Sequence, residues 1–154
     1  MSEQLSEKEL WNKALQYLSR REYSRMELFA KLGKQSPEAV DSVLDSLEKE
    51  GYLSDRRFTE SFIRMRAAQG HGLNRVRFDL KKKGVDIGLI SEVLDELEMD
   101  WYELATDVYR RKYSQPLDKS DYKERSKRMR FMSQRGFSMD EIQYSLENSE
   151  QQDF

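Results

Sequence analysis

Residues 74–94 read NRVRFDLKKKGVDIGLISEVL, and residues 127–146 read KRMRFMSQRGFSMDEIQYSL. A shift of 52 residues superimposes the two stretches without a gap, and four pairs coincide: Leu80 with Met132, Gly84 with Gly136, Ile90 with Ile142, and Leu94 with Leu146. The N-terminal third has the same outline, with a turn two residues shorter, at Leu28, Leu32, Val40, Val43, Leu44 and Leu47. Repetition at a fixed period indicates tandem structural units. The sequence therefore contains three copies of one unit.

Helix-capping residues support this register independently. Three favoured N-cap residues, whose side-chain oxygens can accept from free backbone amides, each lie four residues before an apolar anchor: Ser36, Asp86 and Ser138. Further end signals are two capping boxes, a proline suited to a first helical position, and three glycines suited to helix ends: Ser24 with Glu27, Ser138 with Glu141, Pro37, Gly51, Gly84 and Gly136. These signals predict two consecutive helices in the second part of each unit.

A leading helix precedes these two in every unit. Apolar residues at a spacing near 3.6 predict it at Glu7–Arg21, Asp55–Gln69 and Trp101–Tyr113. No stretch alternates convincingly with a period of 2, so the sequence predicts an all-α fold of three tandem three-helix, helix-turn-helix-like repeats. Units this small need neighbours to bury their apolar surface, so we expect an elongated, curved row.

The unit boundaries follow from these helices. We predict repeats at residues 1–53, 54–100 and 101–148, with a flexible tail at 149–154. The polar run around Pro116 predicts a loop at residues 114–121.

The residue types needed for catalysis or metal binding are scarce. The chain has no cysteine and one histidine, His71, which lies between two glycines without a sequence neighbour able to complete a metal site or an acid–base pair. We predict a loop position for His71, in reach of a phosphate. The sequence gives no phosphate-binding glycine loop, and we expect no cofactor, no metal and no enzymatic activity.

Apolar patterning assigns further residues to the core or to the surface. The methionines at or near apolar positions are expected to be core residues: Met26, Met65, Met129 and Met132. Phe137, which aligns with Val85, is also predicted to be buried, whereas Phe131 aligns with Asp79 and could lie in the core or stack on a base of single-stranded nucleic acid. No apolar run approaches the ~18 residues of a membrane span, and the N-terminus lacks the pattern of a signal peptide. We therefore expect a cytoplasmic protein.

Charge is segregated along the chain although the net charge is only −2. Residues 56–83 contain nine Lys/Arg and two acids, residues 84–107 eight acids and no Lys/Arg, and residues 108–135 ten Lys/Arg and three acids. Solvated helix faces could explain such bands, but their separation favours a surface that meets a polyanion or a charged partner. The candidate contact residues are the cations of the second and third units: Arg64, Arg66, Arg75, Arg77, Lys81, Lys82, Arg110, Arg111, Lys123, Lys127, Arg130 and Arg135.

Several short motifs resemble those of RecX proteins, the bacterial regulators of the RecA recombinase. The motifs are, in order, Gly51-Tyr-Leu-Ser-Asp55-Arg-Arg-Phe58, Phe62-Ile63 with Arg66, Gly70-His-Gly72, Val76 with Leu80-Lys-Lys-Lys-Gly84, and Phe131 with Gln134-Arg-Gly-Phe137 and Ile142. The resemblance covers residues 10–147. It departs mildly at Met132, where leucine is common in the family.

The resemblance implies a fold and a function. It implies tandem three-helix repeats that bind in the groove of the RecA–DNA filament as a negative regulator, limiting filament growth, ATPase and strand exchange. RecA and its filament would be the partners, with possible direct contact to single- or double-stranded DNA, no membrane, and a monomeric chain. Two other hypotheses compete with this one: a free-standing DNA-binding protein of tandem helix-turn-helix type, which the net charge of −2 disfavours, and a scaffold that only pairs proteins.

Overall fold

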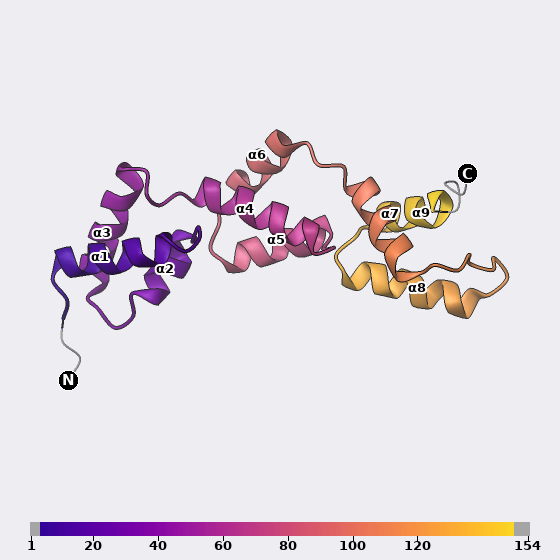
Figure 1. The fold of residues 1–154 in the computed structure, drawn as a ribbon, viewed down its shortest axis with the longest axis horizontal. Helices are drawn as coiled ribbons and strands as arrows, with labels where there is room; N and C mark the ends of the chain where they lie inside the picture. Colours follow the sequence, from indigo (N-terminus) through magenta and orange to yellow (C-terminus); the bar gives the residue numbers. More distant parts are fainter. Residues whose placement is uncertain (1–3, 150–154) are drawn as a thin grey trace. The chain divides into compact units, whose positions relative to one another are not determined.

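The computed structural model describes residues 4–149, and this part of the chain is all-helical (Figure 1). It contains nine helices and no strand between residues 4 and 149: α1 Glu7–Leu18, α2 Arg25–Lys31, α3 Pro37–Lys49, α4 Asp55–Ala68, α5 Leu73–Lys82, α6 Ile87–Leu97, α7 Trp101–Lys112, α8 Tyr122–Gln134 and α9 Met139–Asn148. The all-α prediction is confirmed. α1 ends three residues earlier than expected, at Leu18, because a turn must connect it to the capping box at Ser24.

By packing, the chain divides into two compact units. Unit 1 comprises Met1–Ser61 with Leu80–Glu96, and unit 2 comprises Phe62–Asp79 with Leu97–Phe154. The division passes through α4 and through α5, so each of these helices contributes one part to unit 1 and the other part to unit 2.

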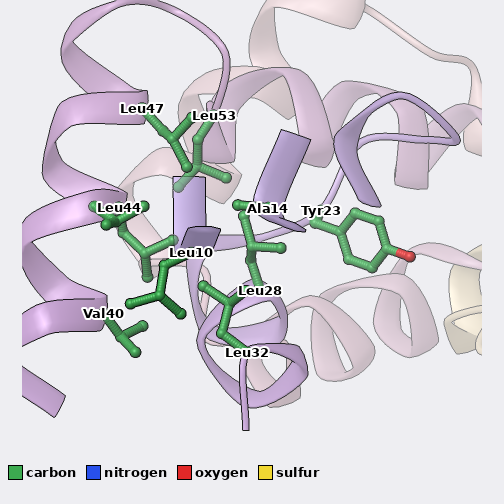
Figure 2. Close-up of a cluster of buried hydrophobic side chains, with 10 residues drawn as sticks. Leu10, Ala14, Tyr23, Leu28, Leu32, Val40, Leu44, Leu47 and Leu53 are labelled. Atoms are coloured by element: carbon green, nitrogen blue, oxygen red, sulfur yellow. The ribbon is translucent and has the colours of Figure 1, made fainter. Parts of the chain in front are cut away.

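The core of unit 1 lies between α1, α2 and α3 (Figure 2). Leu10 and Ala14 on α1 point toward Leu28 on α2, toward Leu32 at the end of that helix, and toward the apolar face of α3 at Val40, Leu44 and Leu47. The α3 residues recur every three or four positions and so lie on one face of the helix. This cluster confirms the apolar pattern predicted for the N-terminal repeat.

The core of unit 2 lies where α7 packs along α9. Its fully buried members come from all three helices of the last repeat and from the turn before α9: Ala105, Tyr109, Met132, Phe137 and Ile142. The predicted burial of Phe137 and Met132 is confirmed. Met26 and Met65 were expected in the core, but they are 58% and 46% exposed, so the apolar stripes of α2 and α4 face solvent at these two positions.

Helix ends follow the predicted caps with one exception. The boxes at Ser24 and Ser138 form, Asp86 accepts from the amide of Gly88 at 3.0 Å, and a third box forms at Ser6. Ser36 precedes α3 as predicted, but its hydroxyl donates to the Glu38 carboxylate instead of accepting from the backbone, so Pro37 marks this helix start without a side-chain cap. Gly51, Gly84 and Gly136 have φ of 83°, 82° and 102°, the left-handed conformation predicted for them.

The loop predicted at 114–121 is confirmed as the irregular connection between α7 and α8. Of the tail predicted at 149–154, Ser149 caps the end of α9, and residues 150–154 lie outside the described residues. Within the described part, every helix is too short or too polar to span a lipid bilayer.

Candidate interaction surface

The α4–α5 turn is held against the α8–α9 turn in unit 2 by the backbone. The amide of Gly72 donates to the carbonyl of Arg135 at 2.7 Å, and the amide of Asn74 donates to the carbonyl of Gly136 at 3.0 Å. The approach is so close that a Cβ on Gly72 would lie 2.5 Å from the amide nitrogen of Phe137. We call this pair of turns the glycine clasp. It fixes Arg135 beside the end of α4.

A cationic hollow lies next to the glycine clasp. Its volume is about 260 Å³, and its lining comes from the end of α4 and from α7 and α8: Ala68, Gln69, Gly70, Val108, Arg111, Lys112, Phe131 and Arg135. Three of these side chains are cations, and none of the three takes part in an ion pair with another described residue. A hollow with unpaired cations suits an anionic group.

Phe131 is the aromatic surface of this hollow. The Lys112 Nζ lies 5.1 Å and the Arg135 Cζ 5.5 Å from the centre of its ring. Tyr113 meets the same ring edge-on, with centroids 5.8 Å apart. Phe131 is half-buried and packs on the unit 2 core, so both roles left open by the sequence are compatible with its position.

His71, in the α4–α5 turn of the glycine clasp, is buried. It lies in the predicted loop, but only 8% of its surface is exposed, and its Nδ1 has no hydrogen-bond partner in the described structure. The expected reach toward a phosphate is therefore wrong for this conformation. Burial lowers the pKa of His71, and the nearby charges of Arg75, Arg66 and Arg135 lower it further.

A second cationic surface lies on α8. Lys123, Lys127 and Arg130 form the predicted seven-residue row, are exposed, and line a hollow of about 530 Å³ together with Asp121, Glu124 and Ser126. We call this surface the α8 hollow. Its volume is larger than that of the hollow at Phe131, and its lining carries charge of both signs.

The other candidate cations differ in exposure and in the residues that they contact. Arg64 and Arg77 are exposed in unit 2, and Lys81 and Lys82 are exposed in unit 1. Arg75 lies 4.0 Å from the carboxylate of Asp79.

Arg66 and Arg110 are half-buried and already engaged. Arg66 lies over the ring of Phe62 and donates to Gln69, and Arg110 pairs with Asp107 at 3.6 Å. We therefore rank Arg66 and Arg110 below Arg111, Lys123, Lys127, Arg130 and Arg135 as contact residues.

Arg128 lies in the core, although the charge pattern of the sequence alone would place it on the surface. It is 5% exposed and donates to the Tyr109 hydroxyl at 2.9 Å and to the Gln115 carbonyl at 3.0 Å, while its Nε pairs with Glu124 at 3.0 Å. These bonds tie the connection between α7 and α8, residues 113–121, to α8. The repeat register could have predicted this burial, because the 52-residue shift aligns Arg128 with Val76, which is fully buried.

Comparison with known proteins identifies the family. Three RecX models match in order, the first three-helix domain at residues 11–47, the second at 54–94 and the third at 98–146. The chain belongs to the RecX family. The three RecX domains correspond to α1–α3, α4–α6 and α7–α9, so the division into two compact units cuts through the second RecX domain.

Relatives and solved structures agree with this assignment. The chain is 41% identical over 131 residues to the regulatory protein RecX of Pseudomonas fluorescens strain Pf-5, covering 84% of both chains. It is 36% identical over 135 residues to the regulatory protein RecX of Chromohalobacter salexigens, covering 86% of this chain and 88% of that one. A crystal structure of RecX from Lactobacillus salivarius superimposes with a TM-score of 0.78 over 93% of this chain and 96% of that chain, at 22% identity, which supports the fold.

Proposed function

We propose that this RecX-family chain binds in the groove of the RecA–DNA filament as a monomeric cytoplasmic regulator. There it limits filament growth and thereby lowers the ATPase and strand-exchange activities of RecA. The proposal rests on the family, whose members here are named regulatory proteins, and on the cationic surfaces of unit 2.

The observation that links the proposed function to particular residues is a set of unpaired cations in unit 2. None of the six cations that line the two hollows of unit 2 takes part in an ion pair within the described residues: Arg111, Lys112, Lys123, Lys127, Arg130 and Arg135. Unpaired Lys and Arg neutralise phosphates and release counterions, and they also dock on acidic protein surfaces. A nucleoprotein filament offers both kinds of target.

The direct test adds the purified protein, at substoichiometric levels, to RecA on single-stranded DNA. We expect the DNA-dependent ATPase rate to fall, and we expect the protein to co-sediment with preformed filaments. Unchanged ATPase together with no co-sedimentation would refute the proposal.

A charge-reversed variant assigns the effect to the hollow at Phe131. The variant carries Arg111→Glu, Lys112→Glu and Arg135→Glu, and we expect its filament affinity to fall at least about tenfold. The matched control reverses three exposed lysines of unit 1, Lys31→Glu, Lys34→Glu and Lys49→Glu, with the same change in net charge. An equal loss in both variants would mean that net charge alone, and not this hollow, governs binding.

A free-standing DNA-binding role is the second candidate. It is favoured by the ring of Phe131 within a cationic hollow, since a base can stack on an aromatic side chain while cations hold the backbone. Under this alternative, salt-dependent binding to bare DNA would match or exceed binding to RecA filaments. Phe131→Leu, which keeps an apolar side chain, would then weaken binding to single-stranded DNA.

A further inference from the structure

A second clasp, in unit 1, repeats the arrangement of the glycine clasp. The hydroxyl of Ser24 donates to the carbonyl of Lys83 at 2.7 Å, and the Lys83 Nζ pairs with Glu27 at 3.0 Å. Gly84 packs on Met26, where an added Cβ would lie 2.6 Å from the Sδ. Here the α5–α6 turn lies against the start of α2.

The two clasps use the same helical positions. On α2 the contacts come from the residue before the helix and from its second and third residues, Ser24, Met26 and Glu27. On α5 the equivalent positions are Gly72, Asn74 and Arg75, which meet Arg135 and Gly136. In each case the start of a repeat's middle helix receives the glycine turn of the following repeat.

The same three positions on α8 line the α8 hollow. They are Asp121, Lys123 and Glu124, and in residues 4–149 no turn lies against them as one does on α2 and α5. The α8 hollow is therefore the third member of a series whose first two members each hold a protein turn. The corresponding turn of the first repeat, between α2 and α3, is held by the chain's own Gln4, which contacts Lys34 and Ser36. A second copy of the chain could not dock there without displacing Gln4.

The charges of the α8 hollow favour protein over nucleic acid. Lys123, Lys127 and Arg130 run about 10 Å along the helix, which suits carboxylates spaced along a partner helix. Asp121 and Glu124 add negative charge to the same lining. A lining with charge of both signs suits a protein segment, which can itself carry both signs, better than a uniformly anionic phosphodiester backbone. Both carboxylates also bond within this chain, Asp121 accepting from the amide of Glu124 and Glu124 from Arg128, which fixes their positions in the lining.

We propose that the α8 hollow docks a helix–turn segment of a protein partner, a turn followed by a helix that bears carboxylates. The segment takes the place that the next repeat takes on α2 and on α5. For the partner's identity this inference rests on the proposed function: the segment belongs to RecA protein.

A steric variant tests the α8 hollow without changing charge. Ser126→Trp fills it, and Ser133→Trp places the same side chain at an exposed site on the same helix outside it. We expect Ser126→Trp to lower affinity for RecA filaments at least about tenfold and to leave binding to RecA-free single-stranded DNA unchanged. Ser133→Trp should bind both like the unaltered protein. Equal filament affinity of the two variants would overturn the inference.

Two further measurements are needed. The first distinguishes lost docking from misfolding of Ser126→Trp, and the second identifies the molecule that the hollow contacts. The triple variant Lys123→Glu, Lys127→Glu, Arg130→Glu reverses exposed side chains only, and it should lose filament affinity selectively, as Ser126→Trp does. A photo-crosslinking residue at position 126 should join to RecA protein; crosslinks to DNA alone would overturn the inference. If the unaltered protein itself fails to bind filaments, the proposed function and this inference both fail, whereas binding unaffected by any α8 variant refutes this inference alone.

Discussion

In unit 1, Arg25 and Arg56 pair with carboxylates of another helix, whereas the ion pairs among the described residues of unit 2 join residues three or four apart on the same helix. Arg25 on α2 meets three acids of α3, and Arg56 on α4 meets Glu92 and Glu96 on α6. Unit 1 therefore uses Arg25 and Arg56 to hold helices together. Unit 2 is held by the glycine clasp and an apolar cluster, which leaves the cations of its two hollows for a partner.

Part of the acidic band of residues 84–107 is already neutralised by ion pairs within unit 1. Glu92 and Glu96 already bind Arg56 within unit 1. The contrast makes unit 2 the place to look for contacts, and the following variants are designed to break or sharpen it.

The largest effect is expected at the glycine clasp of unit 2. Gly72→Ala would push a methyl group into the backbone of Gly136 and Phe137, where no flexible side chain can give way, and should lower the free energy of unfolding by about 3 kcal/mol. Urea denaturation followed by circular dichroism measures the change. Gly33→Ala in unit 1 is the control, since its φ is 71° but no atom lies within 4 Å of the added methyl; we expect a loss of only about 1 kcal/mol. Equal losses would show that the clasp is not tightly packed.

A smaller loss is expected when the buried cation of unit 2 is removed. Arg128→Ala would leave the Tyr109 hydroxyl and the Gln115 carbonyl without their donor and should cost about 2 kcal/mol in the same denaturation experiment. Proteolysis within residues 113–121 should also become faster, because Arg128 ties this loop to α8. A variant as stable as the unaltered protein would contradict the structural role given to Arg128.

The contrast between paired and unpaired arginines is tested by two single substitutions. Although burial alone would lower it, hydrogen bonds from Arg25 to Glu48 and Asp45 raise its pKa, and the side chain links α2 to α3. Arg25→Ala should cost about 1 kcal/mol of stability and leave filament binding unchanged. Arg130→Ala should do the reverse, weakening filament binding with an unchanged denaturation midpoint. If Arg25→Ala weakened binding more than Arg130→Ala, the division of roles between the two units would be wrong.

The smallest effect concerns pH and arises in unit 2 alone, because His71 is the sole histidine. Its folded-state pKa lies below the ordinary value of 6.5, so the unfolded chain binds the proton more readily. The stability that this group contributes is complete above the ordinary value and is lost as pH falls from there toward the lowered pKa. We expect His71→Gln to reduce the drop in melting temperature between pH 7.5 and pH 5.5. An identical drop in both proteins would exclude His71 as a contributor.

Much of the fold was predictable because local signals and the repeat register agreed. Ser24, Ser138 and Gly136 act at the helix ends where the sequence placed them, since caps depend on neighbours only a few residues away. Met26 and Met65 were misplaced because periodicity alone does not say which edge of an apolar stripe faces solvent.

The candidate surface was less predictable. The charge bands locate cations along the chain, but which of them are free depends on contacts between residues far apart in sequence. Arg128 is buried by Tyr109 and by the 113–121 loop, and Arg135 is placed by a turn more than sixty residues away. Neither contact follows from composition or spacing.

The clasps also set an order for folding during synthesis. Unit 1 needs the helix that ends at Leu97, because its clasp joins Ser24 to Lys83 and its compact body extends to Glu96. Unit 2 cannot close until the ribosome has made Gly136, the acceptor for the amide of Asn74. A growing chain can therefore complete unit 1 while the first residues of unit 2, Phe62–Asp79, still await their partners.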